Sequence, residues 1–193
     1  MKLKNIIKSA ILISIFTMPA FAFKQSEIES GMKNKIEKVL VVLKKKESNT
    51  KKGQQIIAMM DPVFDYDLMS KLTLGSNTWS SITKDQQKEF IRLFIGKLKQ
   101  SYVDKLDLYH NQIVIYKGVK PYQNGRLQLQ TELSGKGEVY KINYNFYNSC
   151  GNWLIYDVVL DGVSIVQTYR QQFAGILKEK TFDQLLSQLK EKK

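Results

Sequence analysis

The sequence is poor in the residues from which metal sites and nucleophilic sites are built. Among 193 residues there is one cysteine, Cys150, and one histidine, His110. A single cysteine cannot form an intramolecular disulfide, so packing alone must hold the fold together. One histidine and one cysteine cannot build a histidine-based metal cluster, and no nucleophile-elbow motif or glycine-rich phosphate loop is present. These absences argue against hydrolytic and metal chemistry.

The few remaining candidates for proton or nucleophile chemistry are isolated. His110 lies where a helical pattern gives way to strands, and a lone histidine there is more often bonded locally or exposed than catalytic. Cys150 lies in a tight turn with no activating cation beside it. Tyr156 and Asp157 are neighbours on a strand and should point to opposite faces, so we expect Asp157 to bond a neighbouring strand or loop group.

The sequence also lacks an apolar run of the roughly 20 residues that span a bilayer. Its N-terminus carries three lysines, a short apolar run at residues 11–16 and the sequence Ala20-Phe21-Ala22. This is the order of a secretory signal peptide, so we expect cleavage after Ala22 and export to the periplasm. No cysteine lies near the cleavage site, and a lipoprotein anchor is therefore not expected. Residues 23–193 are long enough for a single domain with a substantial core.

Negative charge is scarce, with 18 acidic residues against 30 lysines and arginines and a net charge of +12. Removing the three signal-peptide lysines leaves +9, a balance that suits anionic partners. Nucleic acid is not expected, since the chain is exported and carries no zinc-ligand, helix-turn-helix or aromatic RNA-binding signature. The lysine runs at 44–46 and 51–52 are either a solvated helix end or a surface that faces a membrane or partner.

The first half of the mature chain has the spacing of amphipathic helices. The pattern predicts helices over residues 26–46 and 53–60, and over 65–74 with an end near Gly75. Thr83 begins the clearest helix, because Gln86 three residues on can complete a capping box. Apolar side chains then recur every four residues through that helix, which must be covered by other structure or by a ligand.

After His110 the spacing changes to two, which predicts strands. We expect them at residues 113–116, 126–133, 139–147 and 153–160, forming an antiparallel sheet with one wet face and with Tyr144 and Phe146 on the other. Helices follow at 163–178 and from Thr181 onward. The predicted fold class is α+β, with about four twisted antiparallel strands packed by helices.

Several short motifs resemble the MlaC family, also called the toluene-tolerance family. The C-terminal motifs are Gly151-Asn152-Trp153, Tyr156-Asp157, Asp161-Gly162-Val163-Ser164 and Tyr169-Arg170-x-x-Phe173. The middle of the chain contributes Asp61-Pro62-x-Phe64-Asp65, Leu74-Gly75 with Trp79, and the Thr83 cap. The likeness covers roughly residues 51–189, and Thr181 departs from the glycine expected before the last helix.

The resemblance implies a periplasmic phospholipid-binding protein of a retrograde transport system that maintains outer-membrane lipid asymmetry. It implies a nuclear-transport-factor-2-like arrangement around an apolar cavity, with lipid as cargo and no other cofactor. The implied partners are an outer-membrane lipoprotein–porin complex and an inner-membrane ABC transporter with its substrate-binding subunit. Acyl tails would be buried and the headgroup would face water.

We expect the lipid-binding residues among the large apolar side chains: Phe64, Leu68, Leu72, Trp79, Phe90, Phe94, Leu98, Tyr102, Tyr144, Phe146, Tyr169 and Phe173. The sheet residues, the long-helix stripe and the Tyr169–Phe173 pair should converge, either as a dry core or around a slot. One alternative is an isomerase or dehydratase on the same fold that uses Asp157 or His110. Another is an export adaptor or chaperone, which would expose an apolar groove for peptides.

Overall fold

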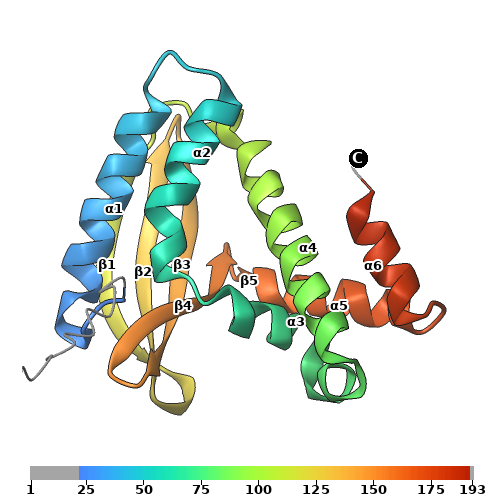
Figure 1. Cartoon of the computed structure of the whole chain (residues 1–193). Coiled ribbons are helices and arrows are strands. Elements are labelled where there is room, and N and C mark those ends of the chain that lie inside the picture. Colours follow the sequence, from blue (N-terminus) through green and yellow to red (C-terminus); the bar gives the residue numbers. More distant parts are fainter. Residues whose placement is uncertain (1–21, 192–193) are drawn as a thin grey trace, which may run out of the picture.

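The computed structural model describes residues 22–191 of the chain (Figure 1). The expected signal peptide, apart from Ala22, lies outside the described residues. The elements follow in the order η1 (Gln25–Glu27), α1 (Ile28–Leu43), α2 (Asn49–Met60), η2 (Asp61–Val63), α3 (Tyr66–Ser81), α4 (Lys84–Val103), η3 (Leu106–Leu108), β1 (Ile113–Tyr122), η4 (Gln123–Gly125), β2 (Arg126–Gly135), β3 (Glu138–Ser149), β4 (Asn152–Leu160), β5 (Val163–Ser164), α5 (Ile165–Leu177) and α6 (Phe182–Lys190).

The strands form one antiparallel sheet in the sequential order β1-β2-β3-β4-β5. The predicted α+β fold is confirmed, with five strands where about four were expected. The additional strand, β5, has two residues and pairs only with Val159 and Leu160. The first strand is longer than predicted, because a register shift between Tyr116 and Gly118 lets pairing continue to Tyr122.

The turns that follow β3 and β4 explain two of the motifs. Cys150 and Gly151 have φ values of 52° and 89°, and Asp161 and Gly162 have 48° and 85°. Two successive residues with positive φ form the tight hairpin whose twist matches that of the flanking strands. Glycine in the second place of each pair reduces the conformational cost.

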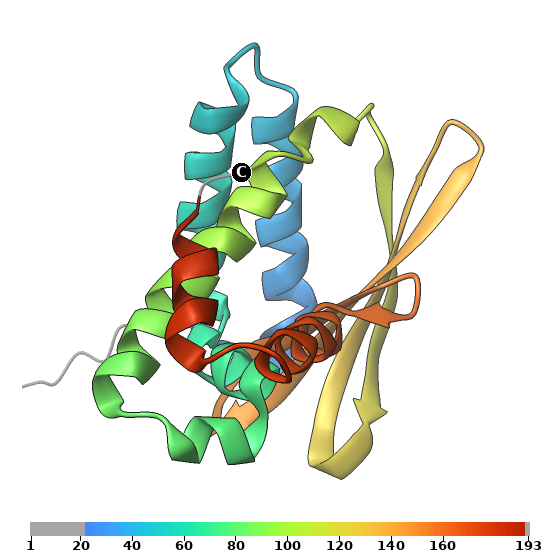
Figure 2. The same cartoon turned by 90° about the vertical axis from the view of Figure 1, so that its right-hand side faces the viewer.

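The helices gather on one side of the sheet. Figure 2 shows the curved sheet on one side of the molecule and α1, α2 and α4 on the other. The open face carries Gln130, Glu132, Lys141 and Asn143, which alternate along β2 and β3 with residues that face the helices. The predicted wet face is therefore present, and the arrangement is consistent with the nuclear-transport-factor-2-like layout.

Buried apolar side chains form two separate clusters. The sheet core joins α1 to the sheet and contains Phe23, Ile28, Met32, Ile36, Val63, Leu127, Leu129, Phe146, Trp153, Ile155 and Val158. The helical core contains Met69, Leu74, Phe90, Leu93, Phe94, Leu98, Val166, Phe173, Leu185 and Leu186. Two partly buried residues, Phe64 and Ile165, pack against both cores.

The capped helix starts were predicted correctly. Thr83 and Thr181 both form capping boxes, with Gln86 and Gln184 respectively. The helix end predicted near Gly75 is confirmed, because the backbone there is non-helical with a φ of 74°, and a second helical segment that was not predicted completes α3 up to Ser81. The start predicted at residue 53 is wrong, since α2 begins at Asn49. Within residues 22–191, no helix is both long enough and apolar enough to cross a membrane.

Candidate binding site

The predicted stripe on α4 packs into the helical core. Phe90 and Phe94 are 0 % exposed, and their rings meet the ring of Phe173 edge-on at centroid distances of 5.5 and 6.0 Å. Phe182 of α6 closes on Phe90 at 6.0 Å. Edge-to-face packing of this kind stabilises a core beyond the area it buries. These rings form a dry aromatic cluster.

Phe146 belongs to the sheet core and not to this aromatic cluster. It is 0 % exposed, and its ring lies 6.4 Å from that of Phe23. The expectation that Phe146 and the α4 stripe share one packed surface or one slot is therefore corrected. The apolar residues were identified correctly as buried, but they divide between two cores because α1 fills the space in front of Phe146.

Three tyrosines, Tyr102, Tyr144 and Tyr169, lie where the two cores meet, and we call the region that they border the recess. Tyr102, in the last turn of α4, is 39 % exposed, yet surrounding protein desolvates its phenol and raises its pKa. The Tyr102 side chain is thus partly in solvent and partly packed against protein. Negative charge at Tyr144 and Tyr169 adds to the rise in the pKa of Tyr102, so all three phenols lie near one another.

The other two tyrosines fix the walls of this recess. Burial raises the pKa of Tyr144, on the helix-facing side of β3, to about 12. Tyr169 of α5 is partly buried, and its ring packs edge-on against Phe94 at 5.1 Å. The recess is thus bordered by α4, β3 and α5, with the helical core behind Tyr169.

Sequence reasoning missed one residue on the same wall. Tyr116 of β1 faces the helices, and its charge contributes to the raised pKa of Tyr144. Its hydroxyl is buried and bonds to no protein atom among the described residues. The spacing of two in the predicted strand was the available sequence signal, but the strand was expected to end at Tyr116. In the structure Tyr116 pairs with Thr131 within a longer strand.

The predicted residues of α3 and its approach lie at the junction of the cores. Phe64 forms a single bridge to Ile155 and stacks on Tyr66 at 5.4 Å. Leu72 and Trp79 pack against the helical core, and Leu68 is partly buried on the same helix. Phe64, Leu72 and Trp79 are therefore part of the packing around the two cores.

The Asp-Pro motif positions α3 and α4. Asp61 accepts hydrogen bonds from Tyr66 Oη at 2.8 Å and from Lys99 Nζ at 2.5 Å, so it ties the start of α3 to the C-terminal part of α4. Asp65 caps α3 by accepting from Leu68 N at 2.8 Å, and it also accepts a hydrogen bond from Tyr147 Oη on β3. The motif is a structural clamp between helices and sheet.

Asp157 is bonded as a structural residue. Its carboxylate accepts hydrogen bonds from Ser164 Oγ at 2.7 Å, from Val166 N at 3.1 Å and from Asn145 Nδ2 at 3.4 Å. Burial raises its pKa, and these hydrogen bonds oppose the rise. The expectation that it bonds neighbouring strand and loop groups is confirmed, and it anchors the first turn of α5 to β4.

The expectation that Tyr156 and Asp157 point to opposite faces is wrong. The register shifts beside Asn145 and Phe146, so Asn145 pairs with Asp157, Phe146 pairs with Ile155, and Tyr156 is the extra residue of a bulge. The Tyr156 ring packs on Tyr147, which shares a face with Asn145. Tyr156 is 5 % exposed and is covered by the Arg126 guanidinium at 4.4 Å, so no open acid/base pair results.

The other two candidates for chemistry lie apart from the recess walls. His110 is exposed after η3, and its backbone N donates to Gln112 Oε1 at 2.6 Å. Cys150 is exposed in the β3–β4 turn. Among residues 22–191 no group of three or more histidine, cysteine or acidic side chains is placed to hold a metal ion.

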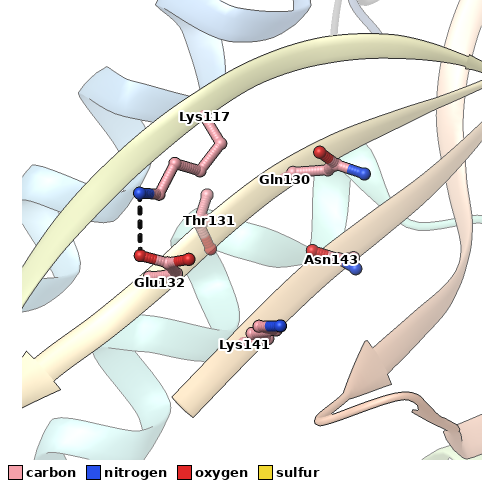
Figure 3. A pocket seen from close by; sticks show the side chains of 6 residues that line it. All are labelled: Lys117, Gln130, Thr131, Glu132, Lys141 and Asn143. Atoms are coloured by element: carbon pink, nitrogen blue, oxygen red, sulfur yellow. Dashed lines mark ion pairs between the residues drawn. The ribbon is translucent and has the colours of Figure 1, made fainter. Parts of the chain in front are cut away.

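The open face of the sheet carries a separate polar depression of about 300 Å³ (Figure 3). Lys117 and Glu132 form an ion pair across it at 2.9 Å, and Gln130, Thr131, Lys141 and Asn143 complete the lining. Its charged and amide side chains give no apolar surface for an acyl chain.

The structure is therefore an α+β fold of the class in which helices cover one face of an open antiparallel sheet. A family profile described as MlaC protein matches residues 33–191. The chain belongs to the MlaC family.

Two curated relatives and one solved structure give the comparison its detail. The chain is 28 % identical over 121 residues to toluene tolerance protein ttg2D of Pseudomonas putida, covering 62 % of this chain and 56 % of that protein. It is 24 % identical over 135 residues to the intermembrane phospholipid transport system binding protein MlaC of Haemophilus influenzae, covering 67 % and 63 %. The chain thus spans about three fifths of the length of these relatives.

The solved structure is that of a phospholipid-binding protein from Ralstonia solanacearum in complex with a phospholipid. It superposes with a TM-score of 0.72 at 24 % identity, covering 83 % of this chain and 93 % of that chain. This likeness establishes the shared fold.

Proposed function

We propose that this protein is a periplasmic phospholipid carrier that holds acyl chains in the recess between its sheet and α4. The observation that carries the proposal is the division of the buried apolar side chains into a sheet core and a helical core, with the partly exposed Tyr102 in neither. Family membership and the phospholipid bound by the Ralstonia protein of the same fold support it. Tyr102, Tyr144 and Tyr169 border the proposed site.

Burial of acyl chains explains why such a carrier is needed. Two chains of about 30 methylenes in total, at ~0.8 kcal/mol each, gain on the order of 25 kcal/mol on leaving water. A bilayer offers nearly the same gain, so transfer between carrier and membrane is close to balanced. The direction of transport must then come from partners that bind one state of the carrier better than the other.

The proposed partners are those implied by the family: an outer-membrane lipoprotein–porin complex and an inner-membrane ABC transporter with its substrate-binding subunit. The name of the Haemophilus relative, a binding protein of an intermembrane transport system, supports this assignment. We further propose that residues 1–22 are removed on export and that residues 23–193 act as one domain.

Carriage requires no catalytic group, and we propose that the protein has none. The isomerase or dehydratase alternative needs Asp157 or His110 beside a substrate. The Asp157 carboxylate accepts hydrogen bonds from three donors, and His110 is exposed in a loop. Asp157→Asn should therefore leave lipid binding intact in folded protein.

The test is mass spectrometry of organic extracts from mature protein purified without detergent. We expect diacyl phospholipid in roughly stoichiometric amount, since an apolar recess left empty forgoes contacts with its lining. Tyr102→Glu should strongly reduce the lipid content, because it places a charge against the acyl chains.

The matched control is Tyr122→Glu, because the 37 % exposure of Tyr122 is similar to the 39 % of Tyr102 and Tyr122 is the last residue of β1. It should keep its full lipid content. Extracts that contain only small polar metabolites would contradict the carrier function. Equal lipid content in both variants would place the lipid elsewhere in the molecule.

A further inference from the structure

Exposed apolar side chains concentrate at one end of the molecule, which we name the upper end. It comprises the end of α1 and the loop to α2, the end of α4 with η3, and the turn between β2 and β3, all at the top of Figures 1 and 2. Among residues 22–191, ten large apolar side chains are exposed. Val41, Tyr102 and Leu108 lie in these segments, and Ile113, Val139 and Tyr140 lie in the adjoining first residues of β1 and β3.

The same end carries a concentration of positive charge. The α1–α2 connection has the sequence Lys44-Lys45-Lys46-Glu47, and Lys51 and Lys52 follow in the first turn of α2. Lys51 pairs with Glu47 at 3.5 Å, and Lys45 bonds the neutral amide of Gln55. Among the described residues, Lys44 and Lys46 form no ion pair. Lys105 and Lys136 add charge beside η3 and in the β2–β3 turn.

A shallow groove of about 470 Å³ between α1 and α2 is lined by both apolar and positively charged side chains. Val41, Val42, Ala58 and Met59 supply its apolar lining, and Lys38 and Lys45 stand at its sides. Val41 is 62 % exposed although it lies in the last turn of α1. Val41 belongs to neither of the two cores.

We propose that the upper end docks on an anionic phospholipid bilayer. Single apolar side chains from separate turns, each beside lysines, can enter the headgroup region while the ammonium groups stay at the anionic surface. Tyr102 and Tyr140 fit this interface, where an apolar ring and a polar hydroxyl are both accommodated. A protein partner would be expected to need a contiguous apolar centre with an aromatic anchor in a pocket, which these scattered residues do not form.

The position of the recess strengthens the inference. Tyr102, which borders the recess, also belongs to the upper end, so docking there would bring the recess next to the lipid surface. This inference rests on the proposed function, because a protein that carries phospholipid gains from touching the membrane directly.

The test is flotation of the mature protein with vesicles at low ionic strength. We expect binding to vesicles of phosphatidylethanolamine with phosphatidylglycerol and little binding to phosphatidylcholine alone. Replacing Lys44, Lys45 and Lys46 by Glu should reduce the partition coefficient by at least about tenfold. The matched control replaces Lys71, Lys88 and Lys180 by Glu, which changes the charge equally away from the upper end, and should stay within about twofold of wild type.

A second pair tests the apolar contacts. Leu108→Ser should weaken binding at about 0.5 M salt, where charges are screened, whereas Val163→Ser, at 61 % against 67 % exposure, should not. Failure of the wild type to float, or equal losses in both lysine triples, overturns the proposal. The proposal is also overturned, in favour of a protein-docking surface, if replacing Lys44, Lys45 and Lys46 by Glu leaves flotation unchanged but blocks lipid delivery to a protein partner.

Lipid content by mass spectrometry separates the two proposals. Wild-type protein that floats but contains no phospholipid contradicts the carrier function and leaves the docking surface standing. Protein that contains phospholipid but does not float contradicts only the docking surface.

Discussion

Gly75 and Arg170 approach so closely that a Cβ atom on Gly75 would lie 3.2 Å from Arg170 Nη2. Gly75 also has a φ of 74°, a conformation that L side chains rarely adopt. This contact joins the kink of α3 to α5, and it links the Leu74-Gly75 motif to the Tyr169-Arg170 motif. Two motifs nearly 100 residues apart are thus parts of one packing arrangement.

Gly75→Ala should destabilise the protein by about 1–3 kcal/mol, because the added Cβ forces both backbone strain and displacement of Arg170. Gly96→Ala is the matched control, since a Cβ there meets no atom within 4 Å and lies within α4. It should be neutral or stabilise by up to about 1 kcal/mol. Urea denaturation measures both, and equal effects would contradict the role assigned to Gly75.

Phe94→Trp should destabilise the protein by about 1–3 kcal/mol through overpacking, since Phe94 is 0 % exposed between Phe90, Tyr169 and Phe173. Lipid content should remain near the wild-type value, because the ring lies behind Tyr169 in the dry core. Lys88→Trp, at an exposed site on the same helix, serves as the control. A stable Phe94→Trp variant with less lipid would move the recess into the helical core.

Asp157→Asn should change how stability depends on pH. Burial raises the pKa of the folded-state carboxyl above its ordinary 3.8, so the folded protein holds the proton more tightly than the unfolded chain. The contribution of Asp157 is then greatest at low pH, decreases as pH rises through the folded-state pKa and stays constant above it. The difference in unfolding free energy between wild type and variant should follow this course. A difference that grows as pH rises would contradict the raised pKa of Asp157 in the folded state.

Thr83→Ala should cost about 1 kcal/mol, because it removes the hydroxyl that accepts from Gln86 N at 3.1 Å at the start of α4. Thr83→Ser keeps that oxygen and should retain most of the stability. Thermal unfolding of the two variants gives the comparison. If both lose the same amount, the methyl group and not the cap is responsible.

Local signals explain which elements the sequence predicts well. The caps at Thr83 and Thr181 depend on residues three apart, and the spacing of two in β2 and β3 depends on side chains of one strand. By contrast, β5 exists only because Val163 and Ser164 pair with Leu160 and Val159. A two-residue strand has no spacing of its own to detect.

The site was harder to predict because periodicity identifies an apolar face and not what covers it. Phe90 and Phe94 were correctly placed on one stripe, but α6 and α5 cover that stripe, and Phe182 and Phe173 supply the contact. Tyr156 was placed on the wrong face because a bulge adds one residue to β4. Such a bulge depends on pairing with β3 and leaves no mark in the spacing of β4 itself.

The separation of the sheet core from the helical core has a mechanical consequence. Among the described residues, only Phe64 and Ile165 pack against both cores. We therefore expect the distance between α4 and the sheet, away from the Asp61 and Asp65 contacts, to change more easily than the packing inside either core. A binding site between two well-packed cores, with a width that can change, would accept acyl chains of different length and unsaturation without a separate fit for each.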